Sequence, residues 1–254
     1  MKKIIVKLVS LICLFVAKVK FNKNCYLIIA PHPDDEIIGL GGLILQQKQA
    51  GREVHLLFLT DGEASGSYTD SDEIKRQRMQ LTEQVCKQLD IPTDCIHRLH
   101  LADGAIPHKN HQGFDDIAQI ITMLIDRIQP DQVFATSATD YWPYDHVACS
   151  QLATEAVVRS ATKPQLWFYW VWAWYNLRPL SLLKLNSKYI YKIDISQQLA
   201  AKHQLMDMYL KPLSPEGKPW SGVLPRAMIY PFGKPVEIVE RCDRPVVKEN
   251  KIED

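Results

Sequence analysis

Histidine and carboxylate residues crowd one short turn near the start of the chain. The stretch CYLIIAPHPDDEIIGLGG, Cys25 to Gly42, places a histidine and three acids directly after an apolar segment. His32 and Asp35 are three residues apart, so both side chains can converge on one metal ion. Imidazole nitrogen and carboxylate oxygen suit Zn²⁺, and a catalytic zinc site keeps an open position beside three protein ligands. Asp34 would point elsewhere, free to accept a proton from a water.

A purely structural interpretation of the same acids is also open. Acidic side chains at the start of a helix are favourable whether or not a metal is present, because they face the positive end of the helix dipole. Pro31 and Pro33 restrict φ on both sides of His32 and stiffen the turn. A stiff turn is what a site of fixed geometry requires, so we favour metal binding.

The third ligand has to come from a second turn. The stretch ATSATDYWPYDHVACS follows another apolar segment and places His146 at the start of a helix. His55 and His97 fall within strand patterns, where a satisfied or surface histidine is expected. His146 is therefore the best third ligand.

The elements that would position these residues alternate along the chain. Strands are predicted at 25–30, 53–60, 95–101, 132–137, 166–172 and 188–196, and helices at 41–51, 71–90, 114–129, 145–161 and 196–210. Ser71 is expected to cap its helix. Alternation of this kind predicts an α/β fold, a single Rossmann-like doubly wound domain with a mainly parallel sheet. Ligands bind such sheets at the carboxyl ends of the strands. The part beyond Pro212 is treated as an appendage of the same domain.

Composition excludes several classes of protein. The formal charge of +1 indicates no nucleic-acid partner. The six cysteines form no Cys-x-x-Cys pair, so neither a zinc knuckle nor a disulfide framework is predicted. Reduced thiols of this kind are typical of a cytoplasmic protein.

The segment over residues 1–23 differs from the domain expected over 24–254. Its apolar run, Ile4 to Ala17, is shorter than the roughly 20 residues that span a bilayer. Lysines follow the run and suit an anionic membrane surface. Three interpretations remain open: a membrane-surface helix, a helix packed on the domain, and an export signal or anchor. The first would make the protein cytoplasmic and peripheral on the inner face of the membrane.

Three stretches resemble the zinc-dependent N-acetylglucosaminyl deacetylases of the PIG-L/LmbE type. They are APHPDDEIIGLGG, FLTDGE and DYWPYDHVA, and the similarity covers about Tyr26 to Ser160. The resemblance implies Zn²⁺ held by His32, Asp35 and His146, with Asp34 as the general base. It also implies an N-acetylated amino-sugar conjugate as substrate: lipid-linked, within an envelope glycan, or a thiol precursor. Softer matches place Arg78 and Asp103 at the substrate.

One departure from the family pattern affects catalysis. The family commonly reads His-Pro-Asp-His, whereas this chain reads Pro143, Tyr144, Asp145, His146. The first histidine, which can stabilise the oxyanion, is absent. Tyr141 and Tyr144 are the candidate replacements, and we favour Tyr141 because Tyr144 sits where its ring can point to solvent. Asp145 would either orient a neighbouring ring or cap the helix.

Two further patterns have a structural interpretation. The glycines of GLGG predict close packing of a helix on the sheet, since their order is not that of a dinucleotide loop. The aromatic run from Leu166 to Tyr175 is expected to form a buried strand, with Trp174 and Tyr175 beyond it as sugar contacts.

Two other functions stay open at this point. The missing histidine favours a metal-binding relative that has weakened or lost catalysis. Alternatively the protein hydrolyses another amide, or a phosphoester with two metal ions, for which Asp61, Asp103 and Asp140 would supply the extra carboxylates.

Overall fold

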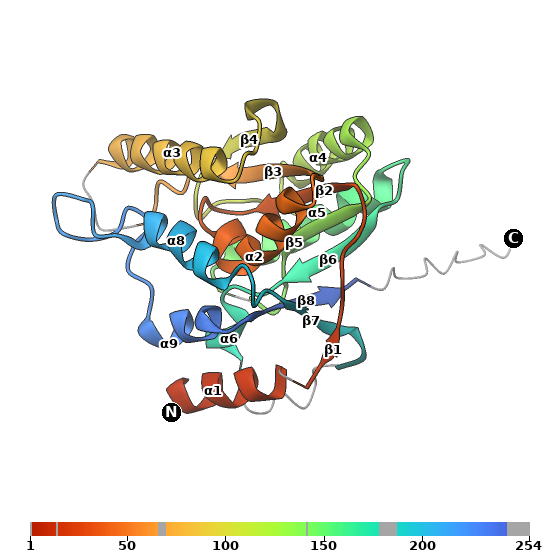
Figure 1. Ribbon diagram of the computed structural model, residues 1–254. Helices are drawn as coiled ribbons and strands as arrows, with labels where there is room; N and C mark the ends of the chain where they lie inside the picture. Colours follow the sequence, from red (N-terminus) through yellow and green to blue (C-terminus); the bar gives the residue numbers. More distant parts are fainter. Residues whose placement is uncertain (1, 14, 66–69, 141, 178–186, 243–254) are drawn as a thin grey trace, which may run out of the picture.

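The computed structural model describes residues 2–13, 15–65, 70–140, 142–177 and 187–242 (Figure 1). The described strands form one sheet in the order β1-β7-β8-β6-β5-β2-β3-β4. Their bounds are β1 Ala17–Lys18, β2 Cys25–Ala30, β3 Glu53–Thr60, β4 Ile96–Leu101, β5 Gln132–Thr136, β6 Gln165–Tyr169, β7 Ile190–Asp194 and β8 Val236–Arg241. Neighbouring strands are parallel except where β8 pairs with β6 and β7. The predicted α/β fold is confirmed.

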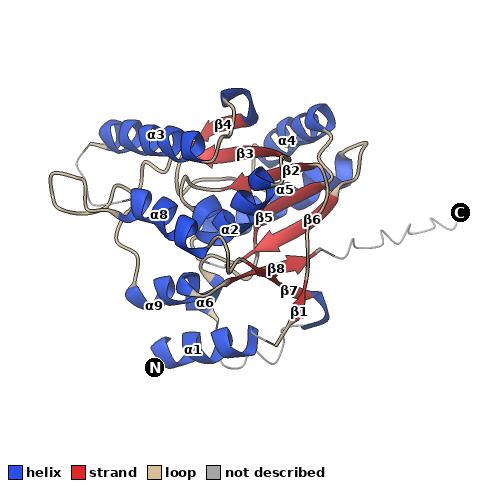
Figure 2. Cartoon of the chain, viewed as in Figure 1, coloured by secondary structure: helices blue, strands red, loops and turns tan. Residues whose placement is uncertain are grey.

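Helices cover both faces of this sheet (Figure 2). Their bounds are α1 Lys2–Cys13, α2 Asp35–Gln49, α3 Ser71–Gln88, α4 Phe114–Ile128, α5 Tyr144–Arg159, α6 Ala173–Asn176, α8 Leu199–Leu210 and α9 Arg226–Ile229. Short 3₁₀ turns are η1 Thr93–Cys95, η2 Ser187–Tyr189 and η3 Tyr230–Gly233. Helices α2, α3 and α8 pack together, and α4 packs with α5.

The central strand β2 shows why the chain folds this way. All of its residues are buried, and they alternate between two cores. Tyr26 and Ile28 belong to the core under α2 and α3, whereas Leu27 and Ile29 belong to the core under α4 and α5. A strand covered on both faces needs an uninterrupted apolar run. Each fully buried aliphatic side chain contributes about 1.5–3 kcal/mol, which makes β2 the centre of the fold.

Two boundaries differ from the prediction. Helix α2 begins at Asp35 rather than at residue 41, because the acids of its first turn suit the helix dipole. The cap of α3 is Asp70 and not Ser71: the Asp70 carboxylate accepts hydrogen bonds from the amides of Asp72 and Glu73 at 3.0 and 3.1 Å.

The treatment of the part beyond Pro212 as an appendage was incomplete, because β8 lies inside the sheet. Its sequence VEIVER includes two acids and an arginine, and the acid Glu237 is buried. Glu237 accepts hydrogen bonds from the Gly42 and Leu43 amides and from Lys202 Nζ, the last at 2.7 Å. Because its hydrogen bonds allow Glu237 to be buried, the strand contains a charged residue where a hydropathy pattern would require an apolar one.

The glycines of the GLGG stretch allow close packing, as predicted. A Cβ on Gly39 would lie 2.3 Å from the Tyr169 ring, and a Cβ on Gly42 would lie 2.5 Å from the Ile195 side chain. Helix α2 therefore approaches β6 and the end of β7 more closely than side chains at these positions would permit.

Helix α1 lies at the edge of the domain beside α6 and α9, at the bottom of Figure 1. Val6, Val9 and Cys13 are buried against the domain. Among the described helices none has the length and apolarity to cross a membrane. Three interpretations of the N-terminal segment were open, and the buried Val6, Val9 and Cys13 show that one face of α1 packs on the domain.

Candidate active site

The predicted residues gather at the carboxyl ends of β2 and β5. His32 and Asp34 lie in the turn between β2 and α2, Asp35 begins α2, and His146 lies in the first turn of α5. Asp34 has a φ of 130° and a ψ of −31°, a conformation that costs a non-glycine residue of order 1–3 kcal/mol. Such strain persists only where the surroundings enforce it, and it is common at functional sites.

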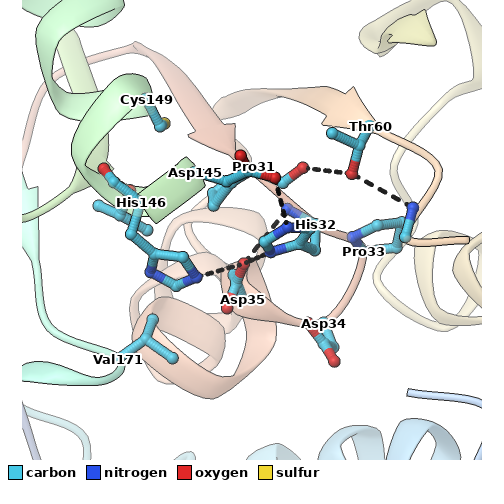
Figure 3. Close-up of polar contacts among 12 residues, drawn as sticks. Pro31, His32, Pro33, Asp34, Asp35, Thr60, Asp145, His146, Cys149 and Val171 are labelled. Carbon is cyan, nitrogen blue, oxygen red and sulfur yellow. Dashed lines mark hydrogen bonds and ion pairs between the residues drawn. The ribbon is translucent and has the colours of Figure 1, made fainter. Parts of the chain in front are cut away.

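His32, Asp35 and His146 form a compact cluster (Figure 3). The Oδ2 atom of Asp35 lies 3.1 Å from His32 Nδ1 and 3.3 Å from His146 Nε2. One ligand atom from each residue lies within 4.8 Å of the other two. His146 Nε2 is buried and makes no hydrogen bond of normal geometry to any described residue. The three side chains thus present nitrogen, oxygen and nitrogen to one point.

In each imidazole, the ring nitrogen that faces away from Asp35 contacts a carboxylate. His32 Nε2 lies 3.0 Å from Asp103 Oδ1 and 3.2 Å from Asp145 Oδ2. His146 Nδ1 lies 3.0 Å from Asp140 Oδ2. When that nitrogen carries the proton, the other nitrogen turns a lone pair towards Asp35. Histidines that bind metals are nearly always oriented in this way.

The electrostatics of the cluster favour a cation. Burial lowers the pKa of His146, but the carboxylates of Asp35 and Asp140 outweigh burial and raise the pKa to about 9. Likewise the pKa of His32 is raised well above its usual value, although burial opposes the effect of the carboxylates around it. The excess negative charge around two neutral imidazoles would be balanced by a divalent ion. The donor set and its charge therefore fit the metal predicted from the sequence.

Asp34 points away from this cluster (Figure 3) and lines an open cavity of about 450 Å³. Burial raises the pKa of its carboxyl to about 7; the Arg78 guanidinium acts in the opposite direction, and Asp35 adds to the rise. A carboxylate with a pKa near 7 is well matched to accept a proton at neutral pH.

Arg78 holds the strained turn. Its side chain is 2% exposed, and its guanidinium donates to the carbonyl oxygens of Gly62 and Pro33 and lies 3.2 Å from Asp34 Oδ2. Gly62 has a φ of +73°, and a Cβ there would lie 2.4 Å from the Arg78 guanidinium carbon. Arg78 therefore positions Asp34. Because Arg78 also lines the cavity and its Nε has no hydrogen-bond partner among the described residues, its contact with the substrate stays a prediction.

Comparison with known proteins identifies the family. The sequence model of PIG-L, described as GlcNAc-PI de-N-acetylase, matches residues 27–157. This chain belongs to the PIG-L family. The match begins in β2 and ends in α5, so it contains the whole His32–Asp35–His146 cluster.

Two curated relatives of the chain are named as deacetylases. A probable N-acetyl-alpha-D-glucosaminyl L-malate deacetylase 2 of Bacillus subtilis is 28% identical over 142 residues, 54% of this chain and 62% of the relative. A diacetylchitobiose deacetylase of Thermococcus kodakarensis is 32% identical over 140 residues, 52% of this chain and 48% of the relative. The chain therefore spans less than two thirds of the length of either relative.

Solved structures share the fold. The N,N'-diacetylchitobiose deacetylase of Pyrococcus horikoshii has a TM-score of 0.57 at 24% identity, over 72% of this chain and 68% of that one. GalB, the 4-carboxy-2-hydroxymuconate hydratase of Pseudomonas putida, has a TM-score of 0.61 at 15% identity, over 90% of this chain and 99% of that one. Because a hydratase has the same fold, the fold alone does not decide the reaction.

Within this PIG-L chain, Asp145 does not cap α5. No side chain makes a cap hydrogen bond at the start of that helix. Asp145 Oδ2 instead accepts from the Gly104 amide at 2.7 Å, and Oδ1 accepts from the Ile106 amide at 3.2 Å. The carboxylate ties the loop after β4 to His32, which matches the orienting role among the two alternatives. Asp103 lies beside it and also contacts His32, while its Oδ2 accepts from the Ala64 amide.

Tyr141 and Tyr144, the two candidate oxyanion donors, precede His146 in the second turn. Tyr141 lies outside the described residues. Tyr144 is 68% exposed and lies at the rim of the cavity. The ring of Tyr144 therefore faces largely towards solvent.

The aromatic side chains of the cavity wall are not those expected. Trp174 is buried in the core, where its ring packs edge-on against Trp170 at 5.2 Å, so its prediction as a sugar contact was wrong. Trp142 and Trp172 line the cavity instead, with ring centroids 4.9 Å apart. Trp174 lies in the short helix α6, whose buried residues are Ala173 and Trp174.

Sequence reasoning missed two residues next to Asp34. Glu36 is buried, its Oε2 accepts from the Asp34 amide at 2.9 Å, and its Oε1 accepts from Tyr209 Oη at 2.9 Å. The Ser221 hydroxyl lies near Asp34 and lowers the pKa of that carboxyl, yet makes no hydrogen bond of normal geometry within the described chain. The third acid of PHPDDE hinted at Glu36, whereas no sequence signal marks Ser221.

The two-metal alternative has partial support, because ligand atoms of Asp103, His32 and Asp145 lie within 4.8 Å of one another. Asp61 is paired with Lys75 Nζ at 2.7 Å and His100 Nδ1 at 2.8 Å. Asp140 and Asp103 are engaged behind the two imidazoles. The group that contains Asp103 shares His32 with the first cluster, whereas Asp61 and Asp140 belong to no such group among the described residues.

Proposed function

We propose that this protein is a zinc-dependent hydrolase that removes the acetyl group from an N-acetylated amino-sugar conjugate. The observation that carries the proposal is the pair of imidazoles, each held by a carboxylate on one side and directed at Asp35 on the other. The relatives named as deacetylases of acetylated amino sugars support the choice of reaction.

Zn²⁺ would be held by His32 Nδ1, Asp35 and His146 Nε2. When bound, the ion supplies Lewis acidity and lowers the pKa of a water ligand to about 7. Asp103, Asp145 and Asp140 keep the two rings in the orientation that this requires.

Asp34 is the general base of the proposed reaction. Its carboxylate accepts a proton as the water oxygen adds to the acetyl carbon. The carbon–nitrogen bond then breaks, and the same proton passes to the leaving nitrogen. The acetic acid formed gives up its proton to the amine, so the products are acetate and the amino sugar as an ammonium group, and atoms and charge balance. Arg78 and the Glu36–Asp34 backbone hydrogen bond hold Asp34 in place for both steps.

The developing oxyanion needs a donor that replaces the absent histidine at Pro143. Our proposal remains Tyr141, because it is five residues before His146 and carries a neutral hydroxyl donor. Tyr141→Phe should lower kcat by about tenfold or more with little change in KM, since the interaction forms mainly in the transition state. Tyr144→Phe is the matched control, and it should retain the parental kcat. If Tyr141→Phe also retains it, the donor is another group.

The decisive experiment measures acetate release from a panel of N-acetylglucosamine conjugates, with lipid, glycan and thiol-precursor aglycones. Activity should disappear on chelation and return with one equivalent of zinc. Release that persists in the metal-free protein would refute the metal dependence.

The second candidate is a metal-binding relative with weakened catalysis, and Pro143 is the observation that favours it. Removing one oxyanion donor typically costs about 10²–10³ in rate. Stoichiometric zinc binding without turnover on any conjugate, in a protein whose fold is intact, would support this candidate.

We also propose that α1 binds an anionic membrane surface. The exposed fractions of its outward apolar residues are Ile4 72%, Leu8 49%, Leu11 57% and, just beyond it, Phe15 88%. The helical spacing of Ile4, Leu8 and Leu11 places these three residues on one stripe of α1, opposite the buried Val6 and Val9. Lys3 and Lys7 are in the same helix, and further lysines follow it. An apolar stripe with adjacent cations suits the interface of an anionic leaflet, which would place the protein at the inner face of the membrane.

Vesicle co-sedimentation tests this surface. Leu8→Glu should reduce binding to phosphatidylserine vesicles at least tenfold, whereas Ile120→Glu on the exposed face of α4 should not. Equal binding by both variants, or binding to neutral vesicles alone, would contradict the proposal.

A further inference from the structure

A second group of metal-ligating side chains lies at the opposite edge of the sheet. Cys25 and Glu53 are the first residues of β2 and β3 and are paired across the two strands. His55 follows two residues later on β3, so its side chain leaves the same face as that of Glu53. Ligand atoms of Cys25, Glu53 and His55 all lie within 4.8 Å of one another. The catalytic cluster, by contrast, follows the carboxyl ends of the strands.

The His55 ring is oriented from both sides. Its Nε2 lies 2.8 Å from Glu53 Oε1, and its Nδ1 lies 3.1 Å from His97 Nε2. His97 extends from β4, and the two imidazole rings stack with an interplanar angle of 13°. If Nδ1 donates its proton to His97, the Nε2 lone pair faces the carboxylate and thiol of the cluster. This arrangement parallels the way in which metal-binding histidines are usually held.

The surroundings of the cluster carry negative potential. The Asp131 carboxylate accepts a hydrogen bond from the Cys25 amide at 3.1 Å, and Glu53 lies opposite Cys25, so two carboxylates lie close to the thiol. The same potential that opposes a free thiolate attracts a cation that would stabilise it.

We propose that Cys25, Glu53 and His55 form a second metal site, which binds a borderline divalent cation such as Zn²⁺ or Co²⁺. A thiolate, an imidazole and a carboxylate select such ions over Ca²⁺ and Mg²⁺, which prefer oxygen alone. His97 positions His55 and is not itself required as a ligand. This inference is independent of the proposed deacetylase activity.

The side chains differ in how freely they can reach an ion. The Glu53 side chain is 59% exposed and the His55 side chain 9% exposed. Glu53 can therefore rotate to accommodate the ion, while Cys25 and His55 are held by the sheet. One exposed ligand also leaves the site open to exchange with solvent.

Cobalt spectroscopy separates the two sites. The catalytic cluster offers only nitrogen and oxygen donors, whereas the second site includes a thiolate. Titrating the metal-free protein with Co²⁺ should therefore give an intense thiolate-to-cobalt charge-transfer band that reaches its plateau after one additional equivalent. Chelation should abolish the band.

Four variants assign the band. Cys25→Ser should abolish it, and Glu53→Gln, at an exposed position that does not endanger folding, should weaken the apparent cobalt affinity at least about tenfold. Glu83→Gln, an exposed glutamate of α3, and Cys149→Ser, a cysteine near the catalytic cluster, should leave the band unchanged. Absence of the band in the unaltered protein, or its persistence in Cys25→Ser, would overturn the proposal. The same holds if Glu53→Gln retains full cobalt affinity.

Discussion

Both edges of the sheet collect histidine and carboxylate side chains, but they hold them differently. At the carboxyl edge, His32 and His146 are well shielded from water, and carboxylates hold the far nitrogen of each. At the amino edge, a neutral imidazole holds the far nitrogen of His55, and the carboxylate of Glu53 is largely in solvent. Charge attracts a cation far more strongly where water is excluded. Residue type alone therefore does not separate a catalytic site from a weaker one; the depth and the charge behind the ligands do.

The largest effect should come from removing a ligand at the carboxyl edge. His146→Ala should lose the tightly bound metal and reduce acetate release to background. Only two protein ligands, His32 and Asp35, would remain, and they are too few to hold the ion tightly. Metal content by mass spectrometry and a turnover assay measure both. His55→Gln is the matched control at the amino edge, and its acetate release should equal that of the parent. Full occupancy of the tight site in His146→Ala would remove this residue from the ligand set.

Asp34→Asn should separate catalysis from metal binding. The variant keeps the three ligands, so its zinc content and its unfolding temperature should match those of the parent. Its kcat should fall by about 10²–10⁴, the usual contribution of a general base. An unchanged kcat would exclude Asp34 from the proton transfer.

Asp140→Asn tests the charge behind His146. The amide oxygen can still accept the hydrogen bond from His146 Nδ1, but the negative charge is gone, and the amide nitrogen replaces the oxygen that accepts from the Ala173 amide. Metal affinity should fall about 10–100-fold, the range found for such orienting partners. Competition with a chelator of known affinity measures the change, and Asp61→Asn, a carboxylate outside the cluster, is the control. Equal affinity in Asp140→Asn and the parent would mean that geometry alone orients the ring.

The pH dependence follows from the pKa of about 7 for Asp34. The base is active only when ionised, so kcat/KM should fall as the pH drops below 7, by about tenfold per pH unit. A cation bound beside Asp34 favours the ionised carboxylate, so it moves this acidic limb of the kcat/KM profile to lower pH. The limb should be missing from the residual activity of Asp34→Asn. An identical limb in both proteins would assign the titration to another group.

The sequence by itself determined the parallel strands β2 to β6 and the turn that carries His32 and Asp35. Strands β2 and β3 match their predicted bounds because a strand buried on both faces leaves an uninterrupted apolar run. His32, Asp35 and His146 could be placed together because parallel strands end at one edge of the sheet. These inferences need only local pattern and the rules of βαβ connection.

Tertiary structure alone decided which groups surround these residues. Asp140 and Ser221 reach the site from distant parts of the chain, and nothing in their local sequence marks the side chains that they meet. Glu36 lies in the PHPDDE turn itself, but its partner Tyr209 comes from α8. Trp174 was misplaced for the same reason, since an aromatic residue after a strand can turn inward or outward. The paired acid Glu237 hid β8 from the hydropathy pattern. Hydrogen-bond partners and burial are properties of packing between distant segments, and so they appear only when the chain has folded.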